Sequence, residues 1–167
     1  MKKTNYIIEF IVIGIVGTLW HFIYEWTGDN AFIGAISPVN ESTWEHLKLL
    51  FFPSLIYTAA EWLCIKARQG GYLAASAAGI YAGMGAIVVF FYTYTGILGF
   101  DVMFLDVISF FLGIFVMLYV KWLIIKGEKM LSKSCGVTAA AVLLITATLF
   151  VIWTFMPPEL GIFESPV

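Results

Sequence analysis

Charged residues are scarce in this sequence. Only 12% of its 167 residues are Asp, Glu, Lys or Arg, whereas 61% are hydrophobic. A soluble domain carries about 25% charged residues, and one small core could not hide this much apolar surface from water. We therefore expect a single domain over residues 1–167 whose solvent is a lipid bilayer. The net charge of −2 argues against a nucleic-acid partner.

Cysteine and histidine are equally rare, with two of each. Cys64 and Cys135 fall near the ends of apolar stretches that we place at the cytosolic side, where thiols stay reduced. Their spacing does not match a thiolate metal site, so we predict free cysteines. Two histidines exclude a zinc site with three histidine ligands, and any metal site must also use carboxylates.

Long apolar stretches make up most of the sequence. A helix needs about 20 mostly apolar residues to cross the hydrocarbon core, and five stretches have that length. We predict an all-α, five-helix transmembrane bundle with spans at residues 6–26, 44–65, 72–95, 102–125 and 135–156. The first stretch is longer than the apolar region of a signal peptide and no small-residue cleavage site follows it, so we interpret it as a span.

The lysines and arginines predict the orientation of the chain. Cytoplasmic loops carry an excess of these residues. With five crossings, most basic residues fall on the side of the N-terminus: Lys2, Lys3, Lys66, Arg68, Lys121, Lys126, Lys129 and Lys133. Lys48 falls on the opposite side, with most of the acidic residues. The sequence thus predicts a multi-pass protein of the plasma membrane, with its N-terminus inside and its C-terminus outside.

A row of small residues runs along the third predicted span, at Ala75, Gly79 and Gly83. Such rows let two helix backbones approach closely in a membrane. We interpret this row as packing within one bundle. A homo-oligomer or a partner membrane protein that uses the same row is an alternative.

Polar and ionisable residues gather at the predicted outer end. His21 and Glu25 are four residues apart, which places them on one face of a continuous helix, and we expect both to point into the bundle. The segment that opens the second span adds Glu41, Glu45 and His46, and the fourth span adds Asp106 near its start. Ionisable groups within membrane segments are costly and often functional. We predict that these six residues form a pocket for a metal ion or a small polar ligand.

Helix capping is the competing interpretation of the second segment. Ser42 and Glu45 have the spacing of a capping box, and Asn40 is an alternative N-cap. Capping explains these three residues but does not explain His46. Consecutive residues on a helix point about 100° apart. Glu45 and His46 therefore cannot both reach one point unless the first turn is distorted.

Two motifs carry a resemblance to a known family. They are His21-Phe22-x-Tyr24-Glu25-x-x-Gly28 and Pro38-Val39-Asn40-Glu41-Ser42-x-Trp44-Glu45-His46-x-Lys48. With the proline-containing C-terminal tail, they resemble an uncharacterised family of small bacterial multispan membrane proteins over essentially the whole chain. The resemblance implies a membrane location and no particular substrate.

Three functions are compatible with these residues. His21, Glu25, Glu45 and His46 form a ligand set that suits Zn²⁺, Fe or Mn, and an open coordination position would allow hydrolysis. A transporter or a ligand-binding accessory protein would use the same pocket without a metal. In the third function, the polar groups only join the helices and the protein acts through partners. No nucleophile is evident, since Ser37 and Ser42 occupy loop and cap positions. We expect the tail from Pro157 to fold over the outer mouth.

Overall fold

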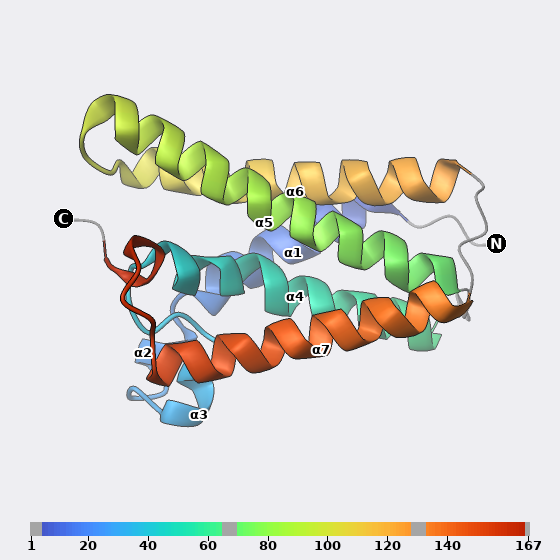
Figure 1. Cartoon of the computed structure of the whole chain (residues 1–167), viewed down its shortest axis with the longest axis horizontal. Helices are drawn as coiled ribbons and strands as arrows, with labels where there is room; N and C mark the ends of the chain where they lie inside the picture. Colours follow the sequence, from blue (N-terminus) through green and yellow to red (C-terminus); the bar gives the residue numbers. More distant parts are fainter. Residues whose placement is uncertain (1–4, 65–69, 128–132, 166–167) are drawn as a thin grey trace.

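Helices make up the fold of the described residues. The computed structural model describes residues 5–64, 70–127 and 133–165, and no strand occurs among them. Five longer helices lie roughly along one axis (Figure 1): α1 (Tyr6–Trp20), α4 (Thr43–Cys64), α5 (Gly70–Leu98), α6 (Met103–Lys126) and α7 (Lys133–Phe155). One-turn helices α2 (Ile23–Trp26) and α3 (Ala31–Gly34) and a 3-10 turn η1 (Gly161–Phe163) lie at the end opposite the N-terminus. The all-α prediction is confirmed.

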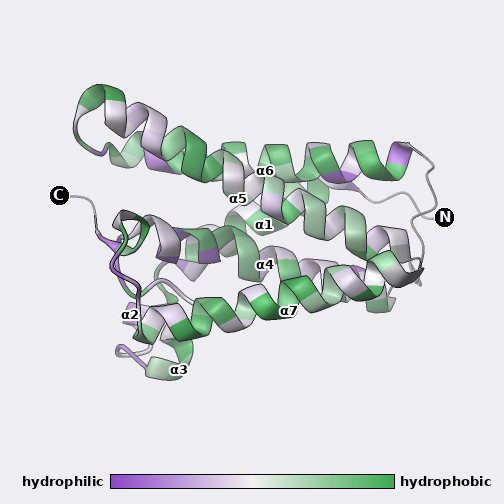
Figure 2. Cartoon of the chain, viewed as in Figure 1, coloured by the Kyte–Doolittle hydropathy of each residue, from purple (hydrophilic) through white to green (hydrophobic). Residues whose placement is uncertain are grey.

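Three of the helices are long and apolar enough to cross a membrane. They are α5 from Gly71, α6, and α7 from Cys135. Figure 2 shows hydrophobic residues along these helices and hydrophilic ones in the connections near α2 and α3. The two other predicted spans differ: α1 is an apolar helix of only 15 residues, and α4 contains Glu45, Lys48 and Glu61. By length and composition, the described residues thus supply three of the five predicted spans.

The first predicted span is interrupted. Residues 6–26 do not form one helix, because α1 ends at Trp20 and α2 begins only at Ile23. The connection between α2 and α4 returns to this point. The indole of Trp20 donates to the Ile36 carbonyl at 2.8 Å, and the Ser37 hydroxyl donates to the Trp20 carbonyl at 2.8 Å. The Trp20 carbonyl, which a continuous helix would use internally, therefore anchors the connection instead.

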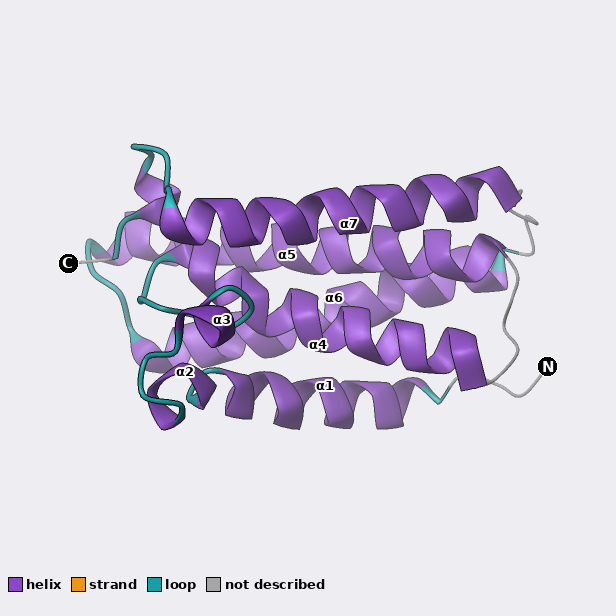
Figure 3. Cartoon of the chain, turned by 90° about the horizontal axis from the view of Figure 1, so that it is seen from below, coloured by secondary structure: helices purple, strands orange, loops and turns teal. Residues whose placement is uncertain are grey.

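Small residues bring α5 and α6 into close contact (Figure 3). A Cβ at Gly79 would lie 2.5 Å from the Met117 carbonyl oxygen, and one at Gly83 would lie 2.6 Å from the Gly113 carbonyl oxygen. No side chain fits in such a space. The small-residue row of the third predicted span therefore packs within the bundle, beside the buried core residues Leu50, Ile80, Ile114 and Met117.

Gly83→Leu is expected to lower the free energy of unfolding by about 1–3 kcal/mol, because the added side chain must push α5 away from α6. Gly85 is a matched control on the same helix, since a Cβ there would meet no atom within 4 Å. Thermal unfolding of the purified variants in detergent measures the difference. Equal stability of Gly83→Leu and Gly85→Leu would contradict this packing.

The C-terminal tail folds back onto the start of α4. The Phe163 ring lies 5.1 Å from the Trp44 ring and 5.6 Å from the Trp153 ring, measured between centroids. The tail thus lies at the end of the bundle that carries α2 and α3 (Figure 1), and its predicted place over the mouth of the pocket stays a prediction. It contacts Trp44 and does not line the cavity described below.

Candidate metal centre

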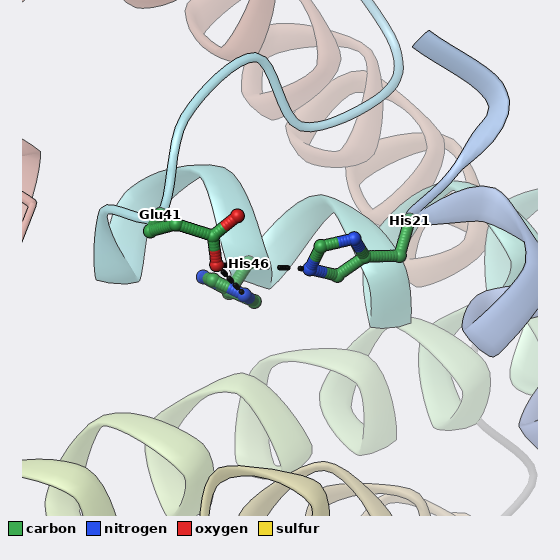
Figure 4. A group of neighbouring side chains, drawn as sticks. All are labelled: His21, Glu41 and His46. Carbon is green, nitrogen blue, oxygen red and sulfur yellow. Dashed lines mark ion pairs between the residues drawn. The ribbon is translucent and has the colours of Figure 1, made fainter. Parts of the chain in front are cut away.

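Three side chains from separate segments converge near the end of α1 (Figure 4). His21 follows the last residue of α1, Glu41 lies in the connection before α4, and His46 belongs to the first turn of α4. The Nε2 atoms of His21 and His46 lie 3.7 Å and 3.4 Å from the same carboxylate oxygen, Glu41 Oε2. One ligand atom from each residue lies within 4.8 Å of the others. Two imidazole nitrogens and one carboxylate oxygen thus converge on one location.

The backbone at the start of α4 orients His46. The Ser42 carbonyl oxygen lies 3.1 Å from His46 Nδ1, so this ring nitrogen carries the hydrogen that is donated to it. The other ring nitrogen, Nε2, faces Glu41. Metal-binding histidines commonly have this arrangement, in which a backbone carbonyl holds one ring nitrogen and the other is directed at the ligand site.

Helix capping positions Ser42. The Ser42 hydroxyl accepts from the Glu45 amide at 3.4 Å, and the Asn40 side chain accepts from the Ser42 amide at 2.9 Å. Half of the predicted capping box is therefore present. In a complete capping box the Glu45 carboxylate would accept from the Ser42 amide. Here it accepts from the Val39 amide at 3.0 Å. Asn40 and Ser42 thus stabilise the turn that presents Glu41 and His46.

Glu41 is the solvent-accessible member of the three residues. Its side chain is 66% exposed, against 32% for His21 and 28% for His46. When the His46 ring is protonated, its hydrogen bond to Glu41 lowers the pKa of Glu41 below its ordinary value, although partial burial opposes this effect. Glu41 is consequently ionised at neutral pH and available to a cation.

A cavity of about 180 Å³ borders this group of side chains. Glu41 and His46 line one part of it, and Asp101 before α6 and Asp106 in the first turn of α6 line another. The Tyr94 hydroxyl donates a hydrogen bond to Asp106 and so holds its carboxylate in place. Asp106 therefore lines the same cavity as Glu41 and His46.

Two predicted pocket residues lie elsewhere. Glu25 is exposed on α2, because the interruption after Trp20 ends the continuous face that would have carried it with His21. Glu45 is buried and pairs with Lys48, with 2.6 Å between Glu45 Oε2 and Lys48 Nζ. Because consecutive helix residues diverge, His46 points to Glu41 while Glu45 points to the other side.

Lys48 was not among the predicted site residues, and it organises the connection before α4. Its side chain is fully buried, and Nζ donates to the Gly34 and Ser37 carbonyls at 2.9 Å and 3.2 Å. It also donates to Glu45 and to the Thr154 hydroxyl, both at 2.6 Å. A lysine three residues after a glutamate within an apolar helix was the available sequence signal. The partners at Gly34, Ser37 and Thr154 required the tertiary structure.

Comparison with known proteins places the chain in a family. The sequence model of a family of unknown function (DUF6512) matches residues 1–167. The match covers the whole chain, so the chain belongs to this family. No curated protein and no solved structure matches the chain.

Proposed function

We propose that this chain, which belongs to a family of unknown function, is a membrane protein that binds a divalent transition metal ion. His21, Glu41 and His46 would be the ligands. The observation that carries the proposal is the convergence of two imidazole Nε2 atoms on one oxygen of Glu41, at 3.7 Å and 3.4 Å. Of the metals that suit imidazole and carboxylate ligands, Zn²⁺ fits this donor set best.

The distances support a small metal ion. Zinc binds nitrogen and oxygen ligands at about 2.0–2.2 Å, which places neighbouring ligand atoms of a tetrahedral site about 3.3 Å apart. The three donor atoms already lie within 4.8 Å of one another. The Glu41 oxygen is already near this distance from both imidazole nitrogens, so the remaining approach is between the two histidine side chains. Both imidazoles are partly exposed, so an ion has access from the surface.

The cavity beside the ligands favours hydrolysis as the chemistry of such a site. Catalytic zinc sites have three protein ligands and keep a fourth position for water, and two histidines with one glutamate is a known ligand set. Here that fourth position would face the cavity that contains Asp106. A carboxylate beside a metal-bound water is placed to accept its proton. A small polar ligand that binds in the same cavity without a metal is the alternative use of the site.

We also propose that α1 and α4 cross the membrane with the three apolar helices, with the metal site outside. α4 contacts α1, α5 and α7, and its charged side chains are paired inside the bundle, Glu45 with Lys48 and Glu61 with Tyr72. Pairing removes much of the cost of placing charge within a membrane. Since Lys48 and Lys121 are buried, the orientation depends on the other basic residues, which favour an inner N-terminus in the plasma membrane.

An impermeant maleimide is expected to label Glu159→Cys from outside intact cells, because the exposed Glu159 follows α7 at the proposed outer end. The parent protein is the control, since Cys64 and Cys135 lie at the proposed inner ends of their helices. Labelling of Glu159→Cys only after the cells are lysed would contradict the proposed orientation.

Glu41→Ala is expected to weaken zinc binding by about 100-fold or more, since removal of residues that only support metal ligands already costs about 10–100-fold. The metal content of the detergent-purified protein after incubation with zinc and dialysis measures this, together with His46→Ala. Glu25→Ala is a matched control, because Glu25 is an exposed carboxylate on the neighbouring α2. Absence of zinc from the folded parent protein, or equal zinc in all four proteins, would contradict the proposal.

A further inference from the structure

A second group of ionisable side chains is buried far along the bundle from His21 and His46. Lys121 of α6 is 1% exposed, and its Nζ donates to Glu9 Oε1 of α1 at 2.7 Å and to the Tyr72 hydroxyl of α5 at 3.1 Å. Glu61 of α4 lies 3.5 Å from the same nitrogen and accepts a hydrogen bond from Tyr72. Four helices thus contribute one ammonium group, two carboxyl groups and one phenol.

The charges in this cluster do not balance. Glu9 and Glu61 are 2% and 8% exposed, and among the described residues only Lys121 opposes them. In the part of the chain that the structure describes, the other titratable side chains that face the cluster are the tyrosines Tyr6 of α1 and Tyr57 of α4, which are neutral. An uncompensated charge in a poorly solvated interior is strongly unfavourable. The cluster must therefore gain one positive charge to be neutral.

One carboxylate oxygen of the cluster lacks a hydrogen-bond partner. Glu9 Oε2 is buried and has no hydrogen-bond partner among the described residues, whereas Glu9 Oε1 is paired with Lys121. Buried polar atoms in native proteins are nearly always paired, and an exception needs an explanation. A proton is the smallest cation that removes the excess negative charge, and it needs no space beyond that already present.

We propose that Glu9, Glu61, Tyr72 and Lys121 form a proton-binding site, in which the two glutamates hold one proton between them at neutral pH. The proton comes from water and bonds to a carboxylate oxygen, and Lys121 neutralises the remaining carboxylate. Two strongly interacting groups titrate as a pair, so the proton belongs to the pair of glutamates. The hydrogen bonds from Lys121 to Glu9 and Tyr72, and from Tyr72 to Glu61, connect the two carboxyl groups.

This site is independent of the proposed metal centre. Glu9 precedes His21 by three turns of α1, and Lys121 lies near the opposite end of α6 from Asp106. Buried Asp, Glu and His residues in membrane bundles form proton relays. Glu9, Glu61 and Lys121 form a buried polar group of this kind.

Infrared spectroscopy of the full-length protein tests the proposal, because a protonated carboxylic acid has a carbonyl stretch that is distinct from the bands of a carboxylate. We expect this band at neutral pH in the parent protein, and we expect it to shift when glutamate is labelled with carbon-13. Glu9→Gln and Glu61→Gln should each lose the band, because Lys121 then neutralises the one remaining carboxylate. Lys121→Met should about double it, since both glutamates are then protonated.

Two controls separate this cluster from other carboxyl groups. Glu159→Gln removes an exposed glutamate and should leave the band unchanged. Asp106→Asn removes the other carboxyl group that accepts a tyrosine hydrogen bond, and carbon-13 glutamate does not shift its band. Absence of a glutamic-acid band from the folded parent protein at neutral pH would overturn the proposal, even if the Gln variants failed to fold. A band that persists in both Gln variants would overturn it too.

Discussion

Zinc affinity is expected to fall about 100-fold for each pH unit below the range in which imidazole ligands lose their proton. His21 and His46 bind a metal only through an unprotonated Nε2. Below that range each imidazole carries a proton that the metal must displace, which contributes about tenfold per pH unit for each histidine. Above that range the histidines contribute no further dependence.

Glu41 should not contribute to this loss of affinity. The hydrogen bond from His46 lowers the pKa of Glu41, so the carboxylate is retained while the imidazoles become protonated. The stabilisation that comes from its lowered pKa is present above the ordinary carboxyl range. It disappears only when the pH falls through the lowered value.

Zinc titrations of the detergent-purified protein at a series of pH values measure the slope. His21→Ala should bind zinc more weakly and should halve the slope to about tenfold per pH unit, since only one imidazole then titrates. Glu25→Ala is the control and should keep the full slope. A zinc affinity that does not change across the titration range of histidine would contradict a site with two imidazole ligands.

Lys48→Met is expected to lower the free energy of unfolding by about 3–5 kcal/mol, the usual cost of removing one partner of a buried ion pair. The substitution leaves the Glu45 carboxylate buried without its cation, although Thr154 still donates to it at 3.0 Å. It also removes the donor that holds the Gly34 and Ser37 carbonyls. The connection that leads to Glu41 would lose its anchor on α4.

Equilibrium unfolding of the variants in a lipid-containing detergent measures this cost. Lys48→Met combined with Glu45→Gln should recover part of it, because no unpaired charge then remains. Lys126→Met is the control, since Lys126 is exposed at the end of α6. A cost for Lys48→Met as small as that for Lys126→Met would show that the buried pair does not stabilise the protein.

Local sequence patterns were sufficient to predict features that depend on a single helix. Apolar stretches predicted the positions of α5, α6 and α7 to within a few residues. Spacing alone predicted that Glu45 and His46 would diverge on a regular helix, and they do. The same reasoning failed at Trp20, where α1 ends, because its hydrogen-bond partners Ile36 and Ser37 lie 16 and 17 positions later in the sequence.

The sequence by itself determined that this protein is helical and apolar and that His21, Glu41, His46 and Asp106 belong to one end of it. These properties depend on composition and on the regular geometry of a helix. Only the tertiary structure decided that Glu41 joins the two histidines while Glu25 remains outside, and that Glu9 meets Lys121. Those groupings depend on contacts between side chains as far as 112 positions apart, and no local pattern encodes which charged groups will share a buried site.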